Sequence, residues 1–129
     1  AKKEIADVFK PGDHGSTFGG NCLAITACAA TLSALVRGDY ADHAAKVGAY
    51  MEAKLAKLPH VTEVRGRGLM LGCDLDDAAG DAHDIVARAL AAGAVINATG
   101  AHTLRFLPPL VCEEADVDSL IEILSGVLG

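Results

Sequence analysis

The sequence predicts an α/β two-layer (α+β) domain, in which a small, mainly antiparallel sheet carries helices on one face. Three observations predict this fold. The chain has 129 residues, which suits one domain. Hydrophobic residues make up 51% of it and charged residues 22%, so the chain can bury a core. The hydrophobic pattern also changes along the chain between helical spacing and short strand-like runs.

The first long helix is predicted after a short helix end in 1–10 and a loop at 11–20, which contains a proline and four glycines. Asn21 is a good N-cap for this helix, and Gly38 should end it. The helix is apolar on nearly every side, which predicts deep burial. Because a small domain has little room for such a helix, we also expect it to pack on protein outside this chain.

The remaining elements follow from caps, breakers and hydrophobic spacing. Asp39 can cap a second helix, and Pro59 ends it. Further along, the pattern predicts two strands around a glycine-rich connection in 61–77, a helix over 80–93, strands at 94–97 and 102–110, and a helix over 112–128. Cys112 stands where Ser, Thr or Asp would cap the last helix better.

Composition excludes several classes of function. The net charge is −6 and no Lys/Arg cluster stands out, so nucleic acid is a poor partner. No apolar run reaches the roughly 18 residues of a membrane span, and the expected location is the cytoplasm. The four cysteines form no C-x-x-C pair, so we expect no metal site and mostly buried, reduced thiols.

The stretch "HGSTFGG", at 14–20, has two interpretations. Ser16 and Thr17 offer hydroxyl and backbone N–H donors, the glycines let a ligand approach the backbone, and a helix N-terminus follows. These features are typical of a phosphate cradle, although no Walker motif is present. The alternative is a turn that only leads into the helix.

A second glycine-rich stretch, "GRGLMLG" at 66–72, superficially resembles a dinucleotide fingerprint. That motif requires GxGxxG at the start of a helix, whereas the glycines here are spaced GxGxxxG and a strand pattern follows. We therefore interpret the stretch as a tight hairpin connection flanked by Arg65 and Arg67.

Arg105 lies among apolar neighbours in "LRFLPPL". A buried and unpaired charge is costly, so its guanidinium must reach water or meet an anion. A guanidinium suits a carboxylate because it can form two parallel hydrogen bonds with it. The partner could equally be a ligand carboxylate or an Asp or Glu of the chain itself.

Three stretches together, "VFKPGDHGSTFGGN", "VRGRGLMLG" and "LRFLPPL", resemble the C-terminal third of class III pyridoxal-phosphate (PLP) aminotransferases. Their combination is most similar to the acetylornithine and succinylornithine branch. The resemblance implies the C-terminal small domain of fold-type I PLP enzymes at 59–129. It also implies a helical connection at 21–58 and, at 1–20, a remnant of the large cofactor domain with the His-Gly-Ser-Thr loop.

The resemblance also implies roles for three residues. Thr17 would bind the phosphate of PLP in the active site of the neighbouring subunit of a homodimer. Ser16 would lie beside the substrate, and Arg105 would bind the substrate α-carboxylate. The implied substrates are an amino acid and a 2-oxo acid, with N-acetylornithine and 2-oxoglutarate as the expected pair in arginine biosynthesis.

The Schiff-base lysine of the family lies a few dozen residues before the "GST" motif, and this chain starts too late to contain it. Lys2, Lys3 and Lys10 are too close to the motif to replace it. We therefore expect a C-terminal fragment that is inactive in isolation and does not hold PLP. The alternatives are a fragment of another class III ω-aminotransferase, for ornithine or 4-aminobutyrate, and a stand-alone non-catalytic ligand-binding or interaction domain.

Overall fold

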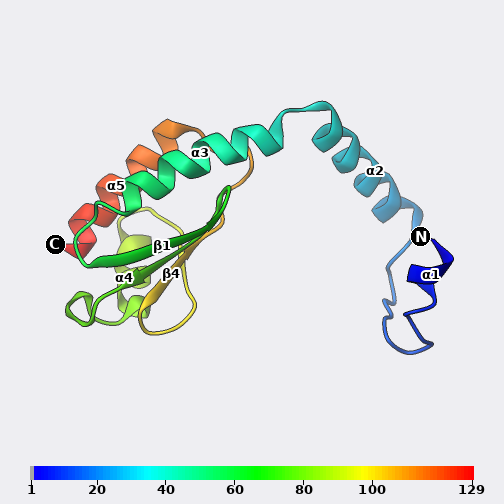
Figure 1. Ribbon diagram of the computed structural model, residues 1–129, viewed down its shortest axis with the longest axis horizontal. Coiled ribbons are helices and arrows are strands. Elements are labelled where there is room, and N and C mark those ends of the chain that lie inside the picture. The colour runs from blue at the N-terminus through cyan, green and yellow to red at the C-terminus, as the bar shows by residue number, and fades with distance from the viewer. Residues whose placement is uncertain (1) are drawn as a thin grey trace. The chain divides into compact units, whose positions relative to one another are not determined.

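The computed structural model describes residues 2–129 and divides the chain into two compact units, Ala1–Gly38 and Asp39–Gly129 (Figure 1). The first unit contains α1 (Lys3–Ala6) and α2 (Cys22–Arg37). The second unit contains the sheet and the other helices. The sequence-based domain boundaries after residues 20 and 58 refer to the domains of a complete aminotransferase, and they stay a prediction.

The sheet of the second unit has four strands in the order β1-β2-β4-β3, and every neighbouring pair is antiparallel. The strands are β1 (Val61–Arg67), β2 (Met70–Leu75), β3 (Asn97–Ala98) and β4 (Thr103–Phe106). The predicted antiparallel sheet is confirmed. Two strands are shorter than expected. β4 ends before Pro108 and Pro109, which have no N–H to donate to a neighbouring strand.

Three helices cover one face of this sheet: α3 (Tyr40–Leu55), α4 (Ala82–Ala91) and α5 (Glu114–Leu128). Alternate residues of the strands are buried beneath them, among them Leu71 and Cys73 of β2 and Leu104 and Phe106 of β4. Successive side chains of a strand point to opposite faces, so the residues between them lie on the uncovered face. The predicted arrangement, with helices on one face, is confirmed.

The hairpin between β1 and β2 contacts α3 through two glycines. A Cβ atom added at Gly48 would lie 2.1 Å from the carbonyl oxygen of Gly68, so only glycine fits at Gly48. Gly68 has a φ of 55°, in the left-handed region that glycine tolerates. The two backbones therefore approach each other more closely than side chains would allow.

Two predicted helix caps are confirmed. The side-chain oxygen of Asn21 accepts a hydrogen bond from the Ala24 amide, and that of Asp81 accepts one from the His83 amide. Asp39 occupies the N-cap position of α3 but makes no capping hydrogen bond with its side chain.

The expected capping position of the last helix is wrong. α5 begins at Glu114, its N-cap is Glu113, and Glu113 and Asp116 each accept a hydrogen bond from the backbone of the other. This reciprocal arrangement is a capping box built from two carboxylates. Cys112 is 6% exposed and belongs to the hydrophobic core, so its thiol stabilises packing rather than the helix end.

The predicted deep burial of the first long helix is wrong for the described chain. None of the residues of α2 is buried, and large apolar side chains such as Leu23 and Val36 are more than 80% exposed. The first unit offers no core in which to bury them. The expectation that α2 packs on other protein stays a prediction.

Within residues 2–129 no single helix is long and apolar enough to span a membrane, and α2 and α3 reach that length only when counted together.

Candidate ligand-binding site

The loop at 14–20 is held by its own hydrogen bonds. The Ser16 hydroxyl oxygen accepts a bond of 2.8 Å from the Gly19 amide. A Cβ atom at Gly19 would lie 2.8 Å from both Cβ and Oγ of Ser16, so this turn requires glycine there. Gly20, with a φ of 75°, then redirects the chain toward α2.

Asn21 connects this loop to the helix. Its Nδ2 donates a hydrogen bond to the Phe18 carbonyl, and its Oδ1 accepts one of 2.9 Å from the Ala24 amide. The loop therefore leads directly into a capped helix N-terminus, whose amides and dipole favour an anion. His14 lies against Phe9, with 5.4 Å between the ring centroids.

The two hydroxyls of the loop differ. Ser16 uses its oxygen within the turn, whereas the exposed Thr17 hydroxyl makes no hydrogen bond to any part of residues 2–129. A free hydroxyl beside a glycine turn and a helix N-terminus fits a phosphate group, which accepts several hydrogen bonds. The donors of this loop thus suit the cofactor phosphate that the resemblance implies.

Arg105 projects from β4 on the face that the helices leave uncovered. Its side chain is exposed, and no Asp or Glu among residues 2–129 forms an ion pair with it. The described chain therefore provides no internal carboxylate partner. The two expected partners were a ligand carboxylate and an Asp or Glu of the chain. The exposed guanidinium favours the ligand carboxylate.

Arg65, on the same face, by contrast has acidic partners. Its guanidinium donates two hydrogen bonds to the Asp74 carboxylate and lies 3.9 Å from that of Glu63. The Thr103 hydroxyl donates a further bond of 2.7 Å to Asp74. These donors, Arg65 above all, lower the pKa of Asp74 below its ordinary value. No sequence motif includes Asp74, which lies opposite Glu63 in the register of β1 and β2.

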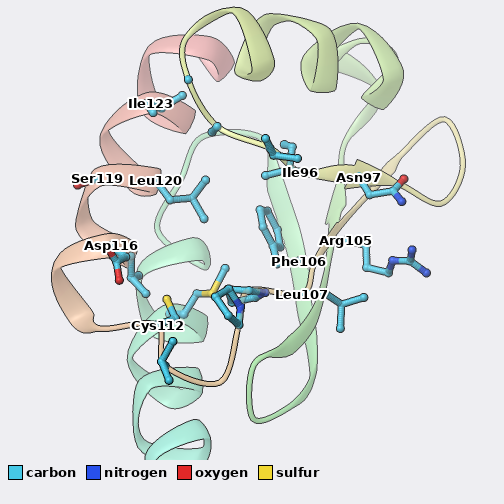
Figure 2. Close-up of a pocket in the computed structure, with 18 residues that line it drawn as sticks. Ile96, Asn97, Arg105, Phe106, Leu107, Cys112, Asp116, Ser119, Leu120 and Ile123 are labelled. Atoms are coloured by element: carbon cyan, nitrogen blue, oxygen red, sulfur yellow. The ribbon is translucent and has the colours of Figure 1, made fainter. Parts of the chain in front are cut away.

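A cavity of about 690 Å³ lies where β3 and β4 meet the loop before α5 (Figure 2). Its lining is mostly apolar and includes Ile96, Leu107 and Leu120. Asn97 and Arg105 are its polar residues on the sheet, and their side chains project on the same side. Sequence patterns gave no reason to choose Asn97 as a candidate binding residue.

The structure brings Ser16 and Thr17 together in one loop of the first unit and places Arg105 in the second unit. Among residues 2–129 no group of three or more His, Cys, Asp or Glu could hold a metal ion.

Comparison with known proteins gives one family. The family model "Aminotransferase class-III" matches residues 1–128. The chain is 43% identical to the acetylornithine aminotransferase of Caldanaerobacter subterraneus over 130 residues, which are 98% of this chain and 33% of that protein. It is 41% identical to the same enzyme of Aquifex aeolicus, over 99% and 32% of the two chains. The chain thus spans about a third of the length of these relatives.

Solved structures agree with this result. The acetylornithine aminotransferase of Elizabethkingia anophelis matches with a TM-score of 0.79 and 29% identity, over 99% of this chain and 33% of that one. An ornithine aminotransferase of Toxoplasma gondii, whose active site contains PLP at partial occupancy, matches with a TM-score of 0.78 and 34% identity, over 97% and 30% of the two chains.

Proposed function

Because this chain belongs to the class III aminotransferase family, we propose that it supplies the C-terminal third of an N-acetylornithine:2-oxoglutarate aminotransferase. The exposed guanidinium of Arg105, without an acidic partner in residues 2–129, carries the proposal at the site. The acetylornithine enzymes among its relatives support the choice of amino donor and hence a role in arginine biosynthesis.

Each candidate residue has a task in this reaction. Arg105 binds the α-carboxylate of the amino acid or 2-oxo acid with two parallel hydrogen bonds, which fixes the orientation of the substrate. Thr17 would donate a hydrogen bond from its hydroxyl to the phosphate of PLP, and the dipole at the N-terminus of α2 would favour the same negative group. Ser16 lies beside the substrate. PLP, on which the family depends, would supply an electron-withdrawing ring and the aldehyde carbon to which the amino group is transferred.

An ornithine aminotransferase is the second candidate, because solved enzymes of that type share this fold closely. Kinetics with N-acetylornithine, ornithine and 4-aminobutyrate would distinguish the donors. In either case we propose that the complete enzyme is a cytoplasmic homodimer, in which Thr17 reaches the active site of the neighbouring subunit.

We further propose that the 129-residue chain is inactive alone. The chain spans only about a third of the length of its aminotransferase relatives, which supports this. Purified chain with added PLP should show no transamination and no lysine-dependent absorbance band of bound cofactor. Turnover by the chain alone would contradict this part of the proposal.

The test of the site uses a chimera in which this chain replaces the matching third of the Caldanaerobacter enzyme. Arg105→Ala should raise KM for the amino donor far more than it weakens PLP retention, and Thr17→Ala should do the reverse. Arg67→Ala, which removes an exposed arginine of β1 without an ion pair in residues 2–129, is the matched control. Loss of PLP from the Arg105 variant would show that this arginine does not serve the substrate carboxylate.

A further inference from the structure

One row of residues crosses all four strands of the sheet. Arg65 lies opposite Gly72, Gly72 opposite Arg105, and Arg105 opposite Asn97. Directly opposite residues in antiparallel strands point to the same face and lie close together. Because the flanking residues of β2 and β4 are buried under the helices, this row lies on the uncovered face.

The polar groups of the row are in different states. The charge of Arg65 is already paired with the Asp74 carboxylate, as described above. Arg105 and Asn97 have no side-chain hydrogen bond to any part of residues 2–129, and both are exposed. Both border the same cavity, and Figure 2 shows their side chains side by side, projecting from β4 and β3 away from Leu120 and Ile123 of α5.

Gly72 is not required by its backbone or by packing. Its φ is outside the left-handed region, and an added Cβ atom would make only ordinary contacts, at 3.8 and 3.9 Å, with Arg65. Because glycine has no side chain, the surface of the sheet between Arg65 and Arg105 stays uncovered at this position. A side chain there would stand directly beside the guanidinium of Arg105.

We propose that Asn97 is a second binding residue for the carboxylate held by Arg105, and that Gly72 keeps the space beside Arg105 open for it. The Asn97 amide donates to one carboxylate oxygen from the β3 side, while the guanidinium binds from β4. The ligand is a small amino acid or 2-oxo acid. This inference rests on the proposed function, because it takes the substrate carboxylate as the group that Arg105 binds.

The test is an NMR titration of the 129-residue chain with 2-oxoglutarate at constant ionic strength, with sodium chloride as the reference. The Arg105 Nε–H signal and the Asn97 side-chain amide signals should shift together and give one Kd. Asn97→Ala should weaken binding roughly three- to tenfold, the worth of one hydrogen bond. Asn97→Asp, which keeps the size of the side chain but replaces the donor with a negative oxygen, should weaken it further. Arg67→Ala should leave the Kd unchanged.

The outcomes separate the two proposals. If Arg105 shifts but the Asn97 amide does not, or if Asn97→Ala binds as tightly as the unchanged chain, the role of Asn97 is wrong and that of Arg105 stands. If neither signal moves up to the solubility limit of 2-oxoglutarate, the carboxylate site itself is wrong and the proposed function loses its main support. Gly72→Val should keep the dispersed spectrum of the folded sheet and weaken binding. Unchanged binding by that variant would overturn the role of Gly72.

Discussion

At the scale of single residues, the uncovered face of the sheet contains two arginines that differ in their ion pairing. Arg65 is neutralised by Asp74, and Arg105 has no acidic partner in residues 2–129. The difference arises from register, since Asp74 lies beside Arg65 across β1 and β2 and pairs with Thr103 in β4. Removing Arg65 would leave Asp74 free to interact with other cations on this face.

Arg65→Ala should raise the pKa of Asp74 toward its ordinary value of 3.8, with Thr103 still holding it partly down. A carboxyl group with a lowered pKa in the folded state stabilises the fold above its unfolded pKa, and this contribution is lost as the pH falls through the folded value. The stability difference between the unchanged chain and the variant should therefore be largest above about pH 4 and shrink in more acidic solution. Carboxyl NMR titration and urea unfolding across pH measure both effects.

Arg67→Ala is the control for this experiment, because that arginine lies on the same strand with no ion pair in the described chain. An Asp74 pKa that is the same in both variants would contradict the assignment of Arg65 as its main partner.

Glycines inside helices also have opposite effects, depending on what surrounds them. Gly48→Ala should destabilise the chain by about 1–3 kcal/mol, because the new Cβ atom would collide with the Gly68 carbonyl oxygen. Gly126→Ala in α5 has nothing within 4 Å of the new atom. It should stabilise the chain by up to about 1 kcal/mol through helix propensity alone. Urea unfolding of the two variants gives the comparison, and equal signs would contradict the close contact.

At the scale of elements, the helix ends show which local rules operate. α5 begins with a capping box of Glu113 and Asp116, whereas α3 has Asp39 at its N-cap without a side-chain hydrogen bond. Asp81, the N-cap of α4, accepts a hydrogen bond from the His83 amide, so the same residue type at the N-cap position differs in what it contributes. Hydrogen bonding, rather than residue type, decides how much a cap stabilises a helix.

Asp116→Ala should cost about 0.5–2 kcal/mol, because it removes the bond that this side chain accepts from the Glu113 amide. Asp39→Ala should cost less, since no capping hydrogen bond is lost. Thermal unfolding measures both, and helix content from circular dichroism shows whether the loss is local to α5. A larger loss for Asp39→Ala would argue against the observed capping.

Local chemistry was sufficient to predict most helix ends. Asn21 and Asp81 cap helices as expected, and the order of helices and strands predicted a sheet with helices on one face. The row that joins Arg105 to Asn97 could not be predicted, because strand register depends on contacts between distant parts of the chain. Burial of α2 was predicted wrongly because an apolar helix indicates a partner but not where the partner lies.

At the scale of the whole molecule, the two units differ in what stabilises them. The second unit has a contiguous core of residues from the sheet and three helices, whereas the first has no buried residue in the described chain. Most stability of helices in proteins comes from packing, so the second unit should dominate cooperative unfolding.

The exposure of the cysteines reflects this difference between the two units. Cys22 and Cys28 are exposed, while Cys73 and Cys112 are buried, so the expectation of mostly buried thiols holds for only two of the four. Burial raises the pKa of Cys73 to about 11, which makes its thiolate scarce at neutral pH. A thiol reagent should label two cysteines quickly in the native chain and four in denaturant. Rapid labelling of all four would contradict the core, and protection of all four would show that α2 is covered by another molecule.

The contact between Gly48 and Gly68 has a mechanical consequence. Where two side chains meet, rotamer changes can absorb a small displacement, but two backbones in direct contact have no such freedom. A shift of α3 along the sheet must therefore move the β1–β2 hairpin as a body. Gly72 belongs to that hairpin, so the space beside Arg105 in the proposed carboxylate site depends on the position of α3.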